Sequence, residues 1–168
     1  LKVVLANDYS NGADGIVAKK EIKNISELKS KKVSVELDTL GEYLLYDALK
    51  KNNLTMSDLQ VVNLSAIDSA QAFIRGEVDA SVTYEPDYTK AVVGGDGWRI
   101  YTSADSPGLI IDVLTFNNDF ATKNPAIVLA VVKSYFEAMI FIAANPDQAY
   151  VIGAKYFKIT SNEFRHNT

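Results

Sequence analysis

The feature that most constrains the fold is an alternation, through the middle of the chain, of short apolar runs with segments of helical periodicity. Strand-like runs rich in β-branched residues occur at residues 33–37 and 79–84. Between them, residues 40–52 carry apolar side chains on one helical face, at Leu44, Leu45, Ala48 and Leu49. This alternation predicts βα units and an α/β fold with a mostly parallel sheet. Beyond Pro125 the pattern indicates helices only, over 126–144 and 147–157.

The alternation also suggests how the chain divides. Residues 31–108 form a complete α/β lobe in this interpretation. Residues 1–30 and 109–168 belong to another body, as a connector and a return strand followed by C-terminal helices. Strand-like segments near Ile16 and Ile111 are expected to run side by side as a hinge, the usual construction of proteins that close on a ligand. Because the chain starts inside a strand-like run, we expect part of the first lobe to precede it.

Charge and residue usage exclude several classes of function. The net charge is -4, and arginine occurs only at Arg75, Arg99 and Arg165, so no basic surface for nucleic acid is expected. Cysteine is absent and His166 is the only histidine, which leaves no set for a thiolate nucleophile, a histidine triad or a zinc site. We therefore expect no catalytic residue, metal or cofactor. Polar residues interrupt the apolar segment 126–144, so no membrane-spanning segment is expected either.

Candidate binding residues follow from the predicted topology. In open α/β sheets, ligands lie beyond the carboxyl ends of the strands, near helix starts whose amide groups can hold an anion. Thr39 is expected to cap one such helix, and Gly41 would let a ligand approach its first turn. The loops selected by this rule are 7–14, 38–42, 66–69, 84–87 and 103–108.

Four sequence segments, in order along the chain, resemble one known family. They are DYSNGADGIVA at 8–18, LKSKKVSV at 28–35, GEVDA with TYEP at 76–86, and the Asn-Pro helix starts at 124–125 and 145–146. They are similar to substrate-binding proteins for the uptake of nitrate, sulfonate, taurine and thiamine precursors. Ser30 replaces a usual glycine of that family, and Tyr84 replaces a common tryptophan.

The resemblance implies a type II periplasmic-binding-protein fold, in which residues 31–108 are the complete inserted lobe and the ligand binds between lobes. It implies a solute-binding component of an ABC importer, located in the periplasm or outside the cell, with or without a lipid anchor. The implied partners are a small anionic or zwitterionic ligand and the permease subunits. The residues that it places at the ligand are Ser10, Asn11, Gly12, Thr39, Leu40, Gly41, Tyr84, Glu85 and Asp112.

Each of these positions also has a structural interpretation. The segment 10–12 is a good turn sequence, Thr39 caps a helix in either case, and Tyr84 could simply be a rim aromatic. Glu85 either pairs with a lysine or faces the cleft, where it would bind the amine of a taurine-like zwitterion. Structural roles are expected for Asp14, Asp79 and Asp112.

Three other functions share this fold. An extracytoplasmic sensing domain would be followed by a membrane span, and the effector domain of a LysR-type regulator would follow a DNA-binding helix-turn-helix. A pyrimidine synthase would need an active-site histidine, a role for which His166 near the chain end is unsuited. The apolar helices 126–144 and 147–157 further suggest that this chain alone forms an oligomer or a domain swap.

Overall fold

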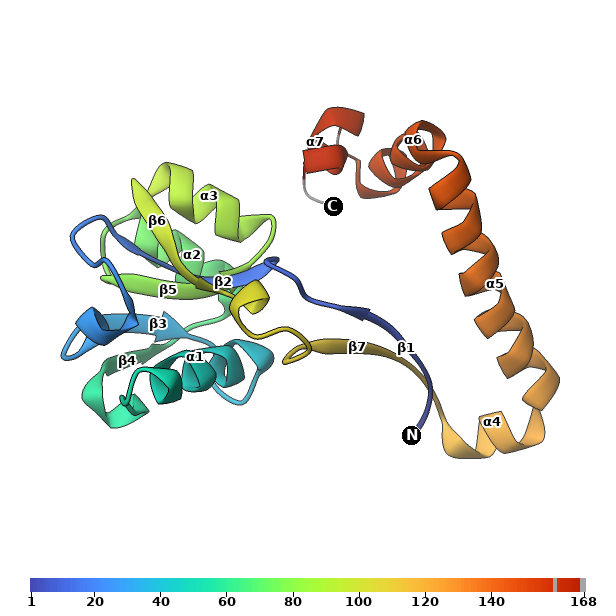
Figure 1. Cartoon of the computed structure of the whole chain (residues 1–168), viewed down its shortest axis with the longest axis horizontal. Helices are drawn as coiled ribbons and strands as arrows, with labels where there is room; N and C mark the ends of the chain where they lie inside the picture. The colour runs from blue at the N-terminus through green and yellow to red at the C-terminus, as the bar shows by residue number, and fades with distance from the viewer. Residues whose placement is uncertain (159, 167–168) are drawn as a thin grey trace. The chain divides into compact units, whose positions relative to one another are not determined.

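A five-stranded sheet forms the centre of residues 9–111 (Figure 1). The structure, a computed structural model, describes residues 1–158 and 160–166. The chain divides into two compact units, Tyr9–Ile111 and Leu1–Asp8 with Asp112–Thr168, called here the sheet unit and the helical unit. The strands are ordered β4-β3-β5-β2-β6. Their bounds are β2 Asp14–Lys19, β3 Lys32–Val35, β4 Gln60–Asn63, β5 Ala80–Tyr84 and β6 Gly97–Thr102.

The direction of β2 makes this sheet mixed, with the expected parallel pairing confined to β3, β4 and β5. Strand β3 runs parallel to β4 and β5, whereas β2 runs antiparallel to β5 and β6. Strands β3, β4 and β5 are joined by helical crossovers, which keep strand direction, but β2 enters between β5 and β6 from the chain's first segment.

The expected hinge pairing is also wrong. Ile16 lies inside the sheet opposite Val82 and Tyr101, because β2 pairs with β5 and β6. Ile111 begins β7 (Ile111–Phe116), which pairs instead with β1 (Lys2–Tyr9). The structure therefore assigns residues 9–30 to the same compact unit as residues 31–108.

Helices cover both faces of the sheet, as Figure 1 shows. Helix α1 (Leu40–Lys51) packs on one face, where Leu44, Leu45, Ala48 and Leu49 are buried against Ile16, Ala18 and Val82. Helices α2 (Ala66–Ile74) and α3 (Asp87–Gly94) pack on the other, where Phe73 and Tyr88 surround Val17. Ile16 and Val17 thus point to opposite faces, as successive residues of a strand must. Three short 3₁₀ turns, η1 (Ile25–Leu28), η2 (Met56–Asp58) and η3 (Ser103–Asp105), complete the unit.

Close packing on the second face requires a glycine in β2. A Cβ atom at Gly15 would lie 2.3 Å from Cζ of Tyr88. Tyr88 is fully buried, its hydroxyl donates to the carbonyl of Tyr101, and the Arg99 guanidinium lies 4.7 Å from its ring centroid. The ring is therefore fixed in place, and only glycine leaves room for it beside β2.

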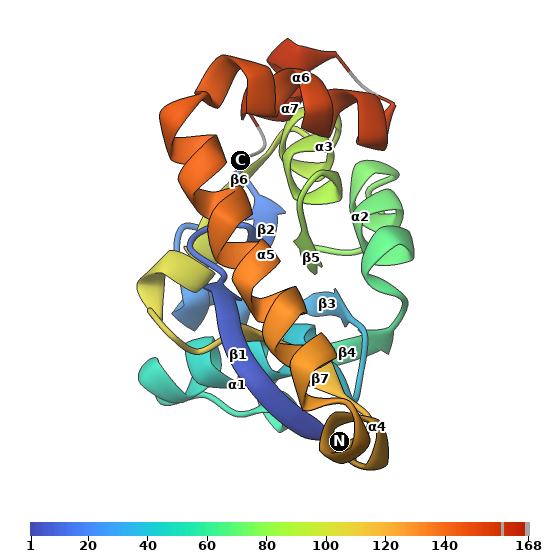
Figure 2. The ribbon, with the colours of Figure 1, turned by 90° about the vertical axis from the view of Figure 1, so that its right-hand side faces the viewer.

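In its described residues, the helical unit contains strands β1 and β7 and four helices. Strands β1 and β7 form a two-stranded sheet. The helices are α4 (Asn118–Lys123), α5 (Pro125–Ala144), α6 (Pro146–Phe157) and α7 (Ser161–His166). Figure 2 gives a second view of β1 and α5, and the Tyr135 hydroxyl of α5 donates to the carbonyl of Asn7 in β1. The two long predicted helices are confirmed to within a residue at each start, whereas α4 was not predicted.

Helix α5 is unusual in its exposure. It has 20 residues with a hydropathy of 2.0, and none of them is buried. By length and composition alone it could cross a membrane, so the expectation that no segment spans a membrane stays a prediction. The same composition is typical of a helix that is surrounded by other elements in a larger core.

Candidate functional site

A cavity of about 180 Å³ opens at the edge of the sheet where β3 and β5 end. All of its lining belongs to the sheet unit. The residues that line it are Asp14, Glu36, Thr39, Leu40, Gly41, Leu44, Ala66, Val82, Thr83 and Tyr84. The structure thus brings together four of the nine predicted site residues, namely Thr39, Leu40, Gly41 and Tyr84.

The position of the cavity follows from the strand directions. The parallel strands β3 and β5 present their carboxyl ends at this edge, so Glu36 and Tyr84 meet there. Since β2 is antiparallel, its first residue lies at the same edge, with Asp14 opposite Tyr84. The loop 7–14 selected from the sequence includes Asp14, but only a structural role was expected for this residue, whereas it lines the cavity.

Two helices start at the cavity. The Thr39 hydroxyl accepts a hydrogen bond from the Gly41 amide (3.2 Å) and donates to the Glu36 carbonyl (2.7 Å), which confirms Thr39 as the cap of α1. At the start of α2, the Ala66 amide donates to a Glu36 carboxylate oxygen (3.1 Å), and Thr83 donates to the Ala66 carbonyl (2.9 Å). The positive ends of both helix dipoles therefore lie at the lining.

Gly41 has no side chain, and this keeps the cavity open beside the first turn of α1. A Cβ atom there would lie 3.5 Å from both the Thr39 hydroxyl and Val82, which is ordinary van der Waals contact. The fold itself could accept alanine at this position. The missing side chain leaves space beside the first turn of α1, as the sequence predicted.

The charged residues of the lining are acidic. Asp14 and Glu36 contribute carboxylates, and none of the lining residues is lysine, arginine or histidine. An anionic group of a ligand would therefore be held by backbone amides and hydroxyls. Within residues 1–158 and 160–166, no group of three or more His, Cys, Asp or Glu side chains is placed to hold a metal.

Ser10 and Gly12 lie behind Asp14 and are not among the lining residues. The Gly12 amide donates to the Ser103 hydroxyl (2.7 Å), and the Ser103 and Ser10 hydroxyls are 2.7 Å apart. Ser10 in turn donates to an Asp14 carboxylate oxygen (2.5 Å), and its amide donates to the Ile110 carbonyl (3.0 Å). Asn11, between them, is exposed. The loop therefore positions a lining residue.

Glu85 lies outside the lining. Its carboxylate accepts hydrogen bonds from Arg99 (2.9 Å), from the Thr89 hydroxyl (2.7 Å) and from the Thr89 amide (3.1 Å). The side chain thus pairs with an arginine and satisfies the first turn of α3. Asp112, the last predicted site residue, is exposed on β7 in the helical unit.

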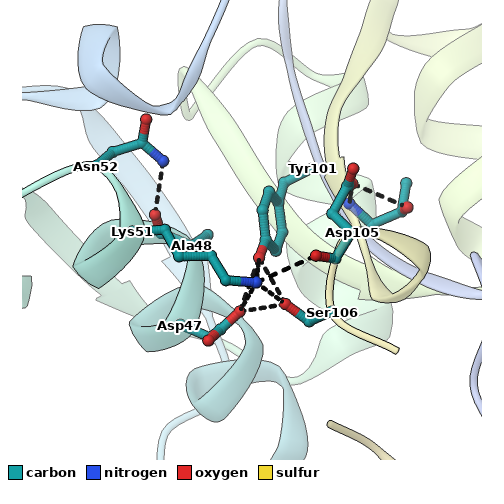
Figure 3. A network of polar contacts seen from close by, with 8 residues as sticks. Asp47, Ala48, Lys51, Asn52, Tyr101, Asp105 and Ser106 are labelled. Atoms are coloured by element: carbon teal, nitrogen blue, oxygen red, sulfur yellow. Dashed lines mark hydrogen bonds and ion pairs between the residues drawn. The ribbon is translucent and has the colours of Figure 1, made fainter. Parts of the chain in front are cut away.

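A second polar cluster joins α1 to the end of β6 (Figure 3). Lys51 lies 3.0 Å from Asp47 and donates to the Tyr101 hydroxyl (2.9 Å) and the Ser106 hydroxyl. Tyr101 and Ser106 both donate to the Asp47 carboxylate. Hydrogen bonding to Tyr101 and Asp47 raises the pKa of Lys51, so its ammonium cannot act as a general base at neutral pH.

The pKa of the Asp47 carboxyl supports the same interpretation of the cluster. Burial raises the pKa of its carboxyl, but hydrogen bonds from Ser106, Tyr101 and Lys51 outweigh that effect and hold the pKa below its usual range. A charged carboxylate beside a charged ammonium forms a fixed ion pair. The cluster connects α1, by hydrogen bonds and an ion pair, to the segment between β6 and β7 that contains Ser106.

The helical unit contains a larger hollow of about 710 Å³. Its walls are mostly apolar side chains of α5, α6 and α7, including Met139, Phe141, Ile152 and Phe164. It lacks the convergent polar groups that orient a ligand, so we regard the smaller cavity as the candidate site.

The sheet unit is a three-layered α/β/α arrangement with helix starts at the carboxyl ends of its strands, a fold that it shares with solved periplasmic binding proteins. The crystal structure of the periplasmic aliphatic sulphonate binding protein SsuA from Escherichia coli superimposes with a TM-score of 0.78. That match covers 94% of this chain and 54% of SsuA, at 24% identity, and shows the common fold. The chain belongs to the NMT1/THI5-like family, which it matches over residues 3–149.

Two other known proteins are also similar to this chain. The taurine-binding periplasmic protein of Escherichia coli (strain K12) is 27% identical over 151 residues, which are 88% of this chain and 46% of that protein. The crystal structure of the desulfurization enzyme DSZB shares the fold with a TM-score of 0.71, over 95% of this chain and 61% of that one, at 13% identity. The chain spans about half the length of the curated relatives it matches.

Proposed function

We propose that this chain is part of the solute-binding component of an ABC importer, which captures a small anionic or zwitterionic ligand of the sulfonate, taurine or nitrate class. The observation that carries the proposal is the cavity at the starts of α1 and α2, where two helix dipoles and the Thr39 hydroxyl favour an anionic group. Family membership and the named taurine and sulphonate binding relatives support the same ligand class.

Binding without chemistry fits the lining better than catalysis does. The cavity has no serine, cysteine, histidine or lysine on its walls, and the Thr39 hydroxyl is engaged as a helix cap. The lining therefore offers no serine, cysteine or lysine nucleophile and no histidine base. Since DSZB has the same fold and is an enzyme, this argument rests on the site and not on the fold.

The location and partners follow from the relatives. Both the taurine-binding and the sulphonate-binding relative are named as periplasmic proteins. We place this protein in the periplasm or on the outer face of the cell, soluble or lipid-anchored, where it would deliver its ligand to permease subunits. The relatives favour this role over an extracytoplasmic sensing domain.

A thermal-shift screen of the full-length protein tests the proposal. Taurine, short alkanesulfonates and nitrate are each added at a large excess, and a ligand at about 100 times its Kd stabilises the native state by about 2.7 kcal/mol. We expect at least one sulfonate to raise Tm by several degrees. The result would contradict the proposal if none of these compounds changed Tm.

Two variants connect such a shift to this cavity. Gly41→Ala places a methyl group beside the first turn of α1 without disturbing the fold, and Tyr84→Ala removes an exposed rim aromatic. Both should keep the Tm of the free protein and reduce the ligand-induced shift. Val93→Ala, an exposed site outside the lining, serves as the control.

A further inference from the structure

Glu36 connects the starts of both helices at the cavity. It follows β3 directly and is half-buried. Its main-chain carbonyl accepts a hydrogen bond from the hydroxyl of Thr39 (2.7 Å), the cap of α1. Its carboxylate accepts the amide of Ala66 (3.1 Å), the first residue of α2. One residue is therefore bonded to both helix starts, and its carboxylate lies at the start of α2.

The two helix starts differ in what accepts their amides. At α1, the Gly41 amide donates to the neutral hydroxyl of Thr39, whereas at α2 the first amide donates to the Glu36 carboxylate. The first-turn carboxylate of α1, Glu42, is not part of the lining and accepts the Asp38 amide, which precedes the helix. A helix start is equivalent to about half a positive charge, so a carboxylate bonded there offsets its dipole. The start of α2 thus already holds an anionic group of the protein itself.

The packing around Glu36 fixes this arrangement. Val35, the preceding residue, is fully buried in β3, and Ala66 is 9% exposed. The hydroxyl of Thr83, on the neighbouring strand β5, donates to the Ala66 carbonyl (2.9 Å). The backbone on both sides of the bond between Glu36 and Ala66 is therefore held by the sheet, and a ligand in the cavity meets the carboxylate at a fixed place.

We propose that Glu36 is a specificity-determining residue of the cavity, which restricts it to ligands with a single negative charge and excludes dianions. The inference rests on the proposed function. The start of α1 receives the anionic group of the ligand, and the Glu36 carboxylate occupies the start of α2, where a second negative charge would otherwise be held. Since the energy of repulsion is proportional to the product of the charges, Glu36 repels a dianion twice as strongly as a monoanion at the same position.

Methanesulfonate and sulfate are a matched pair of probes for this assignment. Both are tetrahedral and similar in size, but methanesulfonate carries one negative charge and sulfate carries two. Ethanesulfonate and 1,2-ethanedisulfonate form a second pair. Isothermal titration calorimetry of the full-length protein, in a buffer without these ions, gives Kd for each compound. We expect the wild-type protein to bind at least one monoanion about tenfold or more tightly than its dianionic partner.

Glu36→Gln removes the charge and keeps an oxygen for the Ala66 amide. Because repulsion is doubled for sulfate, its affinity should rise by the square of the factor found for methanesulfonate, for example about tenfold against about threefold. The desolvation of sulfate is the same in both proteins and cancels from this comparison. Glu85→Gln, which removes a carboxylate outside the lining, is the matched control and should change neither Kd. If Glu36→Gln changed both affinities equally, or neither, the role of its charge would be wrong.

Glu36→Ala tests whether the carboxylate also acts by occupying an amide. It removes the charge, as glutamine does, and in addition leaves the Ala66 amide free for the ligand. Sulfate should therefore bind about threefold more tightly than to Glu36→Gln. Equal Kd values of sulfate for the two variants would contradict the occupation of the α2 start. Thermal denaturation without ligand shows whether both variants are folded, and if they are not, the wild-type ratio decides.

The outcomes for the wild-type protein separate the two proposals. If it binds sulfate or the disulfonate as tightly as their monoanionic partners, the proposed function stands and the role of Glu36 is wrong. If it binds no sulfonate and no nitrate, the proposed function is wrong, and this inference falls with it.

Discussion

The two units of this chain bury very different shares of their apolar residues. In the sheet unit, α1 buries Leu44, Leu45, Ala48 and Leu49 completely, and two clusters fill both faces of the sheet. In the helical unit, α5 is the most apolar helix and buries no residue. Of the described residues in that unit, only Ala121 and Ala154 are buried.

The difference shows that a core depends on partners and not on apolar content. Helix α1 has one apolar stripe and a sheet to receive it. Helix α5 is apolar around most of its circumference, and the two-stranded sheet beside it is too small to cover it. We infer that the sheet unit is stable by itself, whereas the helical unit depends on further contacts.

Hydrogen exchange should show the largest contrast. We expect amides of β2 to exchange only through global unfolding, and amides in the middle of α5 to exchange about a hundredfold faster or more, because little burial opposes local opening. Exchange of the 168-residue chain, followed by mass spectrometry, measures both. If α5 were as strongly protected as β2, at low and at high protein concentration alike, the contrast between the two units would be wrong. Protection of α5 that grows with concentration would indicate the expected self-association.

A matched pair of leucine substitutions compares the two units directly. Leu49 is fully buried in α1, and Leu129 is 54% exposed in α5. Leu49→Ala should reduce the free energy of unfolding by about 2–5 kcal/mol, since it leaves a cavity in a closed core. Leu129→Ala should cost under about 1 kcal/mol. Urea denaturation gives both values, and similar costs would show that α5 has a buried environment in solution.

Glycine substitutions probe how rigid each unit is. An added Cβ would approach a ring to 2.3 Å at Gly15 (Tyr88) and to 2.4 Å at Gly153 (Phe164). Tyr88 is held in the core, so Gly15→Ala should destabilise by about 1–3 kcal/mol. Phe164 belongs to the short helix α7, which can shift, and the better helix propensity of alanine in α6 offsets the cost by about 1 kcal/mol. If thermal denaturation gave equal losses, α7 would be as firmly fixed as the sheet unit.

A smaller effect concerns the acid stability of the sheet unit. Burial raises the pKa of the Asp79 carboxyl, but hydrogen bonds from Lys19 and the Lys32 amide outweigh it, so the pKa is lowered. A lowered pKa stabilises the fold above the unfolded-state value, near pH 4, and this contribution is lost as pH falls through the lower, folded value.

Asp79→Asn should therefore cost about 1 kcal/mol at pH 7 and progressively less below about pH 4. Asp147→Asn in the helical unit breaks an exposed pair with Arg165 and should cost under about 0.5 kcal/mol at any pH. Urea denaturation at several pH values compares them. A loss for Asp79→Asn that does not vary with pH would contradict the electrostatic explanation.

Local signals explain which parts of the site could be predicted. Thr39 before an apolar helical stripe is a cap signal that needs no tertiary information, and Tyr84 precedes Glu85-Pro86, where the predicted strand has to end. Asp14 could not be recognised in the same way. Its place in the cavity depends on β2 running antiparallel between β5 and β6, and strand partners lie far away in sequence. Glu36 and Thr83 lie next to predicted strand ends, so a wider window would have found them.

Glu85 illustrates a different limit. A carboxylate after a strand end satisfies the same rule as a ligand contact, but Arg99, fourteen residues later, occupies it. The interpretation of residues 9–30 meets a related limit. Residues 9–30 resemble a connector because their strand is completed only by residues 80–84 and 97–102.

The central position of β2 also has a consequence for biosynthesis. During translation, β2 leaves the ribosome with both of its edges unpaired, and β5 and β6 follow only after residues 80–84 and 97–102 are made. Until then, Ile16 and Val17 have no sheet to join and are exposed to other chains or to chaperones. The hydrogen bonds that join Ser103 to Ser10 and Gly12, beside Asp14, also have to wait until the segment that carries Ser103 has emerged.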